Sequence, residues 1–346
     1  MKVRKVNPDA GSNHEVTDNG NPFELSVGVR SLKQAGLRMA RKGRAIGVSA
    51  KRWLGRREAG GVKPENIIWI FGAGRTGSTW LSKMMGEMEG CAVWFEPWVG
   101  ALFDPYHLKL EKRKGKAFIL APRYRDTWLA SIRSFVLDGA RARFPGLGKN
   151  GYLVVKEPGG SAGAPLLVEA FSESRMVLLV RDPRDVVASW MDAQSKEGWK
   201  GRKRKERKPA SPYASTTEFV KGRARKYLKN VGGAKKAYDS HEGRKVLVRY
   251  EELRADTLET MKHIYSALEV PVDERELARA VEKHSWENIP EQERGEGKFY
   301  RKAKPGGWRE DLTPEQAEIV ERITAPLLDE LYPESMTARS ANLDVE

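Results

Sequence analysis

The sequence is poor in the residues that form disulfide frameworks, metal clusters and membrane spans. Its single cysteine, Cys91, excludes an internal disulfide and a cysteine-based zinc cluster. The five histidines show no HExxH or similar spacing, so we expect no metal. No apolar run approaches the roughly 20 residues of a membrane-spanning helix, and the first residues, MKVRKVNPDAGSNHEV, lack the apolar core of a secretion signal. We therefore expect a cytoplasmic protein.

The composition describes a globular, basic chain. Its 346 residues are 40% hydrophobic, which is enough to bury a sizeable core in one large or two smaller domains. The net charge of +15 predicts anionic partners, among them nucleotides, nucleic acid, acidic glycans or a membrane surface. Charge alone does not choose among these partners.

Four regions follow from the pattern along the chain. Residues 1–30 are polar and aperiodic and predict a disordered arm. Residues 31–65 predict a basic amphipathic helix and a linker, residues 66–332 the main domain, and residues 333–346 a C-terminal tail. The helix at 31–57 could contact a membrane surface peripherally or pack on the domain; its stripe, rich in Ala and Gly, favours packing.

Short apolar runs predict the strands of the main domain. They lie at residues 67–71, 152–155, 176–180 and 245–248, and helical or loop sequence separates them. Strands that alternate with helices favour a parallel sheet covered on both faces. We therefore predict an α/β fold, a P-loop-like parallel sheet flanked by helices.

Residues 67 to 81, IIWIFGAGRTGSTWL, predict an anion cradle. An apolar strand is followed by a glycine-rich loop and a helix start, and in that order backbone N–H groups point at a ligand. The glycine spacing fits the GxxxxGK[ST] loop that binds nucleoside triphosphates, but Ser78 occupies the lysine position. The cation lies inside the loop instead, as Arg75.

A second segment, MVLLVRDPRDVVASW at residues 176 to 190, repeats the order of strand, turn and helix. Arg181 follows the strand at its carboxyl end, where ligands bind in doubly wound sheets. Asp182 and Pro183 suit a helix cap and first turn, and Ser189 lies a little over two turns into the helix. The segment predicts a second anion site; the structural alternative is an ion-paired helix cap.

A third basic cluster, KFYRKAKPGGWREDLT, covers residues 298 to 313. Arg301, Lys302 and Lys304 stand beside Pro305 and two glycines, so this loop could fold its cations over a ligand. On its own, such a run is most often a solvent-facing loop.

Together the three clusters resemble the nucleotide-binding elements of the sulfotransferases that use PAPS, 3'-phosphoadenosine 5'-phosphosulfate. GRTGSTW resembles the loop that holds the 5'-phosphosulfate, and RDPRDVVAS resembles the segment that holds the 3'-phosphate. FYRKAKPGGWRE resembles the late FxRKGxxGDWK loop, although Ala303 replaces a glycine and Gly307 an aspartate. VLVRYEELRAD and KHSWENI resemble two further family elements, and the match runs from about residue 66 to 330. Several motifs in the correct order identify the chain as a member of this family.

The resemblance implies a single sulfotransferase domain that takes PAPS as co-substrate without a metal. PAPS has no γ-phosphate, so the lysine of the triphosphate-binding loop is not required. The implied nucleotide-binding residues are Gly74, Arg75, Thr76, Gly77, Ser78, Thr79 and Trp80 for the 5' end, Arg181, Ser189, Arg301 and Lys302 for the 3'-phosphate, and Ser285 and Trp286 near the adenine.

The resemblance also implies in-line attack of an acceptor hydroxyl on the sulfur. Arg75 and Lys156 would stabilise the leaving side, and a base must accept the hydroxyl proton. We favour Glu96, in CAVWFEPWVG, because its neighbours are aromatic and FEPW resembles the MEP or FEP sequence of carbohydrate 6-O sulfotransferases. Glu157, in VVKEPGG, is the alternative base or an orienting residue. The ordinary alternative for either is a capping or ion-paired glutamate.

The acceptor is less defined by the sequence. The FEPW similarity favours a glycan or glycolipid hydroxyl over a small phenol or alcohol, and the basic insert KEGWKGRKRKERK at residues 196–208 favours an acidic acceptor. The same insert is most often a solvated loop.

Two rival functions belong to other classes. A P-loop kinase or NTPase would use ATP and magnesium, with VLLVRD as the strand and acid that hold the metal, but Ser78 in the lysine position counts against it. A non-catalytic nucleic-acid binder would fit the charge of +15, yet no RNP, zinc-finger or helix-turn-helix sequence supports it. We therefore expect no nucleic-acid partner.

Overall fold

The computed structural model describes residues 61–104, 121–195 and 215–332. The expected arm at 1–30, the amphipathic helix at 31–57, the basic insert at 196–208 and the tail at 333–346 lie outside the described residues. The structural statements below concern the described part alone.

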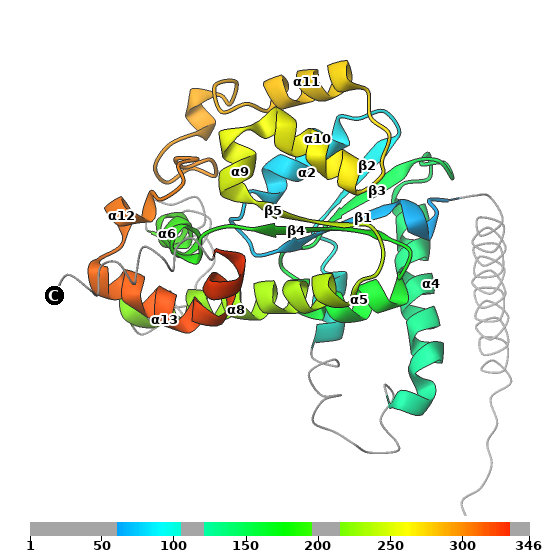
Figure 1. Ribbon diagram of the computed structural model, residues 1–346, viewed down its shortest axis with the longest axis horizontal. Coiled ribbons are helices and arrows are strands. Elements are labelled where there is room, and N and C mark those ends of the chain that lie inside the picture. The colour runs from blue at the N-terminus through cyan, green and yellow to red at the C-terminus, as the bar shows by residue number, and fades with distance from the viewer. Residues whose placement is uncertain (1–60, 105–120, 196–214, 333–346) are drawn as a thin grey trace, which may run out of the picture. The chain divides into compact units, whose positions relative to one another are not determined.

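The described residues contain a sheet of five parallel strands in the order β2-β3-β1-β4-β5 (Figure 1). The strands are β1 (Ile67–Gly72), β2 (Cys91–Phe95), β3 (Tyr152–Lys156), β4 (Arg175–Val180) and β5 (Lys245–Arg249). β1 and β4 are buried at every residue, as apolar runs without alternation predict. The central strand β1 pairs with β3 on one side and β4 on the other, so Ile68 lies between Val154 and Arg175.

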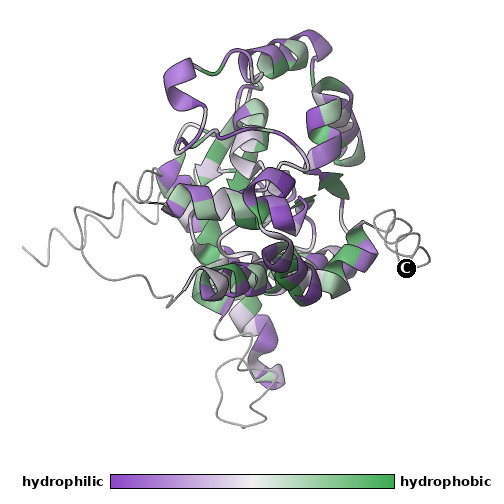
Figure 2. Cartoon of the chain, turned by 90° about the vertical axis from the view of Figure 1, so that its left-hand side faces the viewer, coloured by the Kyte–Doolittle hydropathy of each residue, from purple (hydrophilic) through white to green (hydrophobic). Residues whose placement is uncertain are grey.

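Helices cover both faces of the sheet (Figure 1). One face packs against α2 (Ser78–Gly86), α9 (Tyr250–Ala255), α10 (Thr257–Ala267) and α11 (Glu274–Lys283). The other packs against α4 (Arg125–Arg143), α5 (Ala164–Ala170), α8 (Thr216–Ser240) and α13 (Pro314–Leu331). Hydrophobic and hydrophilic residues alternate along these helices, as expected when one side of each helix faces the core (Figure 2).

The remaining elements lie in the connections. They are α6 (Pro183–Gln194), the short α12 (Trp308–Asp311), and the 3-10 turns η1 (Pro64–Asn66), η2 (Pro122–Tyr124), η3 (Ser161–Gly163) and η4 (Glu291–Glu293). α6 follows β4 and contacts α8, α12 and α13.

The four predicted strands are present, each within a residue or two of its expected bounds. The fifth, β2, was not predicted from the sequence. It is an edge strand with half-exposed residues, and its sequence, CAVWF, directly precedes the turn that carries Glu96. The α/β fold with a parallel sheet flanked by helices is confirmed.

Candidate active site

A cavity of about 610 Å³ lies where the carboxyl ends of the parallel strands meet their connecting loops. Its lining includes most residues that the sequence predicted for a site: Gly74, Arg75, Gly77, Ser78, Thr79, Trp80, Glu96, Lys156, Arg181, Ser189, Trp286, Arg301 and Lys302. Three predicted residues, Thr76, Glu157 and Ser285, do not line it. The three basic clusters, distant in sequence, therefore meet at one cavity.

The loop after β1 has the conformation that its glycines predict. Gly77 has φ of 89° and caps α2, and a Cβ there would lie 2.6 Å from the Tyr250 ring. Thr76 is fully buried and its Oγ1 donates to the Ala73 carbonyl at 2.8 Å, so this side chain shapes the loop and does not face the cavity. The Gly72 N–H donates to Ser161 Oγ at 2.9 Å, which fixes the start of the loop.

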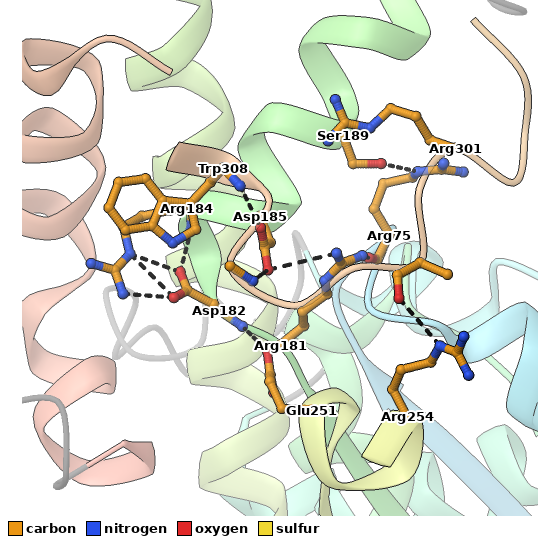
Figure 3. Close-up of polar contacts among 12 residues, drawn as sticks. Arg75, Arg181, Asp182, Arg184, Asp185, Ser189, Glu251, Arg254, Arg301 and Trp308 are labelled. Atoms are coloured by element: carbon orange, nitrogen blue, oxygen red, sulfur yellow. Dashed lines mark hydrogen bonds and ion pairs between the residues drawn. The ribbon is translucent and has the colours of Figure 1, made fainter. Parts of the chain in front are cut away.

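Arg75 is held inside the loop at φ of 79°, in the left-handed region that non-glycine residues rarely adopt. Its Nε donates to Ser189 Oγ at 2.9 Å (Figure 3). Its Nη2 donates to the Phe299 carbonyl at 2.7 Å. Burial lowers the pKa of Arg75 to about 10, and nearby Arg181 contributes in the same direction. A buried guanidinium next to another cation provides a strong site for an anion.

Arg181 lies directly after β4, and its guanidinium stacks over Tyr250 at 4.2 Å. Its Nη1 donates to the Arg75 carbonyl at 3.2 Å, and its Nη2 lies 3.6 Å from Asp185 Oδ2. The Tyr227 hydroxyl donates to the Arg181 carbonyl at 2.7 Å. Each of these contacts fixes the position of Arg181 in the cavity.

Asp185 is a residue that the sequence reasoning missed. It is 1% exposed and accepts hydrogen bonds from the backbone N–H groups of Gly306 at 2.8 Å and Trp308 at 2.9 Å (Figure 3). Burial raises the pKa of Asp185, while Arg181 and these two donors act against the shift. The Asp185 carboxylate thus joins Arg181 to the third basic cluster at residues 298–313, called the late basic loop below. The signal was present in RDPRD, where the second acid lies one helical turn after the arginine.

The helix-cap interpretation of the same segment is confirmed for Asp182. Its side chain accepts the Arg184 N–H at 2.8 Å at the start of α6, and Pro183 occupies the first turn. The Arg184 guanidinium pairs with Asp182 at 2.6 Å and stacks over Trp308 at 4.2 Å. Asp182 therefore caps α6, and its neighbour Arg181 lines the cavity.

The late basic loop brings Arg301 and Lys302 to the cavity wall. Arg301 Nη2 lies 2.5 Å from Asp311 Oδ2, and Lys302 Nζ lies 2.9 Å from Glu310. Ala303, which replaces the family's glycine, has φ of 49°, and its carbonyl accepts from Arg254 Nε at 3.2 Å. The backbone therefore keeps a conformation that favours glycine although the side chain is alanine.

Aromatic residues line the part of the cavity near α11. The Trp80 Nε1–H donates to the His284 carbonyl at 2.7 Å, and Trp80 meets Tyr250 edge-on. Trp286 lines the cavity, whereas Ser285 does not. Of the pair predicted near an adenine, only the tryptophan faces the cavity.

Glu96 and Lys156 form an ion pair in the cavity. Lys156 Nζ donates to Glu96 Oε1 at 2.5 Å and lies 3.8 Å from the centre of the Phe95 ring. Burial lowers the pKa of Lys156, and the hydrogen bond to Glu96 opposes that shift. Glu96 and Trp98 have φ of 48° and 60°, so the turn after β2 is strained where it presents Glu96.

Glu157 is buried outside the cavity lining. It is 1% exposed, and burial raises its pKa to about 7 despite hydrogen bonds from the backbone N–H groups of Trp98 and Val99. A Cβ on Gly160 would lie 2.1 Å from Glu157 Oε1 and 2.7 Å from the Ala101 nitrogen. Glu157 therefore contacts the backbone that carries Glu96, and the glycine permits the close approach.

A wall formed by α8 was also missed. Arg223, Lys226, Tyr227 and Asn230 line the cavity, and their spacing of three and four residues places them on one side of the helix. The Asn230 Nδ2 donates to the Pro158 carbonyl at 2.9 Å. No local pattern in the sequence predicts this wall, because it depends on how α8 packs across the sheet.

The described residues contain neither a candidate membrane span nor a candidate metal site. No helix in this part of the chain is long and apolar enough to cross a membrane. No group of three or more His, Cys, Asp or Glu side chains in the described ranges is arranged to hold a metal ion.

Comparison with known proteins identifies the family of the chain and agrees with its fold. The sulfotransferase domain family matches residues 65–332, and the chain belongs to this family. Cytosolic sulfotransferase 16 of Arabidopsis thaliana is 29% identical over 167 residues, which are 42% of this chain and 48% of that protein. The chain thus aligns with about half the length of this curated relative.

Solved structures show the same fold. Sulfotransferase STF9 from Mycobacterium avium has a TM-score of 0.50 at 17% identity, covering 78% of this chain and 77% of its own. Mouse sulfotransferase SULT7A1, complexed with PAP, has a TM-score of 0.50 at 14% identity, covering 76% and 85%. The predicted family and fold are confirmed.

Proposed function

We propose that the protein transfers the sulfonate group of PAPS to an acceptor hydroxyl. The observation that carries the proposal is the convergence of the β1 loop, the β4–α6 segment and the late basic loop on one cavity. The family to which the chain belongs, and a mouse relative in fold that was solved with PAP, support the same conclusion.

The cavity residues suit a nucleotide with two anionic ends. Arg75, at the helix start that follows β1, would hold the 5' end together with the backbone N–H groups of the loop. Arg181 and Ser189, with Arg301 and Lys302, would hold the 3'-phosphate. Trp80 and Trp286 offer aromatic faces for the adenine. PAPS supplies the sulfonate and the bisphosphate leaving group.

Glu96 is our candidate for the base. It lines the cavity, accepts from Lys156 and is presented by a strained turn, which are features of a functional carboxylate. In the proposed step the hydroxyl oxygen bonds to sulfur, the bond between sulfur and the 5'-phosphate oxygen breaks, and the hydroxyl proton moves to Glu96. Lys156 and Arg75 stabilise the charge that develops on the leaving oxygen.

Glu157 has another role in this proposal. Its carboxylate is buried outside the cavity lining and accepts from the turn that carries Glu96. We infer that Glu157 positions Glu96 and takes no proton from the acceptor.

The acceptor that we propose is a glycan or glycolipid hydroxyl. Phe95 and Trp98 are 51% and 50% exposed, and both belong to the cavity lining beside Glu96. Exposed aromatic faces suit the apolar faces of sugar rings as well as their polar edges. A cytoplasmic location completes the proposal.

Calorimetric titration tests the proposed function against the kinase alternative. We expect adenosine 3',5'-bisphosphate (PAP) to bind without magnesium and more tightly than AMP or ATP, because only PAP places a phosphate at Arg181. Equal binding, or a preference for ATP with magnesium, would overturn the sulfotransferase activity and favour the kinase.

A further inference from the structure

The α8 wall of the cavity contains cations that the nucleotide site does not use. Arg223 and Lys226 belong to the cavity lining but to none of the three motifs proposed for PAPS. Arg223 stacks over Trp190 at 4.3 Å and over Phe219 at 5.0 Å, which holds its guanidinium in place. The wall is therefore basic and ordered.

Lys226 differs from three other lysines of the same helix. Lys221 pairs with Glu218, Lys229 with Asp104, and Lys235 with Asp239. In the described ranges no carboxylate pairs with Lys226. Lys226 is an exposed residue that lines the cavity. Partial burial of its ammonium lowers the pKa of Lys226, and the neighbouring cations Arg223 and Lys229 lower it further. An anionic ligand would relieve this repulsion.

The packing of α8 sets where such an anion would lie. Asn230 is fixed to the carbonyl of Pro158, two residues beyond Lys156. Lys226 precedes Asn230 by about one helical turn, or about 6 Å along the axis, and Arg223 precedes it by about 10 Å. Glu96 and Lys226 line the same cavity, so one acceptor could place a hydroxyl at Glu96 and an anionic group at Lys226.

We propose that Lys226 and Arg223 form an acceptor subsite that binds an anionic group of a glycan in the same cavity as the hydroxyl that receives the sulfonate. The subsite deepens the proposed function and rests on it. It gives the acceptor a chemical class, a glycan that already carries negative charge.

The test uses two probes that differ only in charge: a hyaluronan tetrasaccharide, which carries carboxylates, and its carboxyl-reduced neutral counterpart. Binding of each to the full-length protein saturated with PAP is measured by calorimetry. We expect the carboxylate form to bind at least tenfold more tightly, because charge-assisted hydrogen bonds are about twice as strong as neutral ones. Lys226→Gln and Arg223→Gln should each reduce that preference several-fold.

Two matched controls lie on the same helix. Arg225 and Lys236 are exposed and do not line the cavity, so Arg225→Gln and Lys236→Gln should keep the preference of the unmodified protein. Equal affinity for the two probes, no binding of either, or the same loss in the controls would overturn the subsite. So would a loss of PAP affinity in Lys226→Gln as large as in Arg181→Ala, because Lys226 would then serve the nucleotide.

The proposed function is tested by a separate measurement that does not involve the subsite. PAP titration of the unmodified protein, without a glycan, decides whether the nucleotide site is correct. Preferred PAP binding combined with equal affinity for the two glycans would leave the sulfotransferase proposal in place and remove the subsite alone.

Discussion

Lys156 Nζ and Glu96 Oε1 lie 2.5 Å apart, on β3 and on the turn after β2. The Glu96 N–H also donates to the Lys156 carbonyl at 2.9 Å, so main chain and side chains join the same two residues. A lysine that contacts both the candidate base and the cavity can stabilise the leaving side only while its position is fixed. The Lys156 side chain is 3% exposed, which meets that condition.

Replacing Glu96 by Gln should lower turnover and leave nucleotide binding nearly intact. General base catalysis contributes about 10²- to 10⁴-fold, so we expect kcat to fall by at least about 100-fold. Sulfonate transfer to a glycan acceptor and PAP titration give the two readings, and Glu242→Gln, at an exposed residue, is the control. If Glu96→Gln kept full rate while Glu157→Gln lost it, the base would be misassigned.

Removing Arg75 or Arg181 should weaken the nucleotide complex. Each guanidinium is held by two or more contacts and lines the cavity, so Arg75→Ala and Arg181→Ala should each raise the Kd of PAP at least about tenfold. Arg322→Ala, whose side chain is 67% exposed on α13, should leave the Kd unchanged. Unchanged PAP affinity in either cavity variant contradicts the nucleotide site.

Glu157 should give the protein a pH-dependent stability. Its pKa is about 7 in the folded state, against an ordinary 4.5, so between these values the folded state retains a proton that the unfolded state has lost. The free energy of unfolding should therefore fall as pH rises from about 4.5 to about 7, by on the order of 3 kcal/mol. Glu157→Gln should flatten this slope in urea titrations at several pH values. Equal slopes in the two proteins are the contrary result.

Ala303→Gly should stabilise the protein. The alanine has φ of 49°, which costs a non-glycine residue about 1–2 kcal/mol, while glycine adds about 0.5–1 kcal/mol of unfolded-state entropy. We expect the free energy of unfolding to rise by about 0.5–1 kcal/mol. The same replacement at Ala278, inside α11, should lower it by about 1 kcal/mol. A lower free energy of unfolding in both Ala303→Gly and Ala278→Gly would show that the backbone at Ala303 is not strained.

Adjacent glycines in α8 should respond oppositely to alanine. Nothing lies within 4 Å of a Cβ at Gly232, so Gly232→Ala should stabilise the helix by about 0.8–1 kcal/mol. A Cβ at Gly233 would lie 2.6 Å from the Ala162 Cα and 2.8 Å from the Ser161 carbonyl. Gly233→Ala should therefore destabilise the protein and move the α8 wall. Equal thermal unfolding temperatures in the two variants would contradict this packing.

Much of the fold could be predicted because its information is local. Fully buried strands such as β1 and β4 are short apolar runs, and parallel strands bring their carboxyl ends to one edge. Arg75 and Arg181 follow those strands, so a parallel sheet places both cations at the same edge, where they are in contact. β2 was missed because an edge strand is only half buried and lacks a clear pattern.

The sequence analysis missed those parts of the site that depend on the direction of a side chain or on packing between distant segments. Lys156 and Glu157 are neighbours at the end of β3, where successive side chains point to opposite sides, so only one could face the cavity. The sequence offers both as candidates and cannot choose between them. Asp185 reaches the site through its contact with Gly306, and Asn230 fixes α8 to Pro158, and no local motif records either long-range contact.

Asp185 accepts hydrogen bonds from the backbone N–H groups of Gly306 and Trp308, and these bonds matter for inhibitor design. A compound that enters past the late basic loop must break two main-chain hydrogen bonds to a buried carboxylate. A compound that enters past Phe95 and Trp98 meets two exposed side chains, of which Phe95 packs against Lys156. If the proposed function and subsite are correct, selective compounds should be elaborated inward from Phe95 and Trp98, with an acidic group directed at Lys226 and Arg223 on α8.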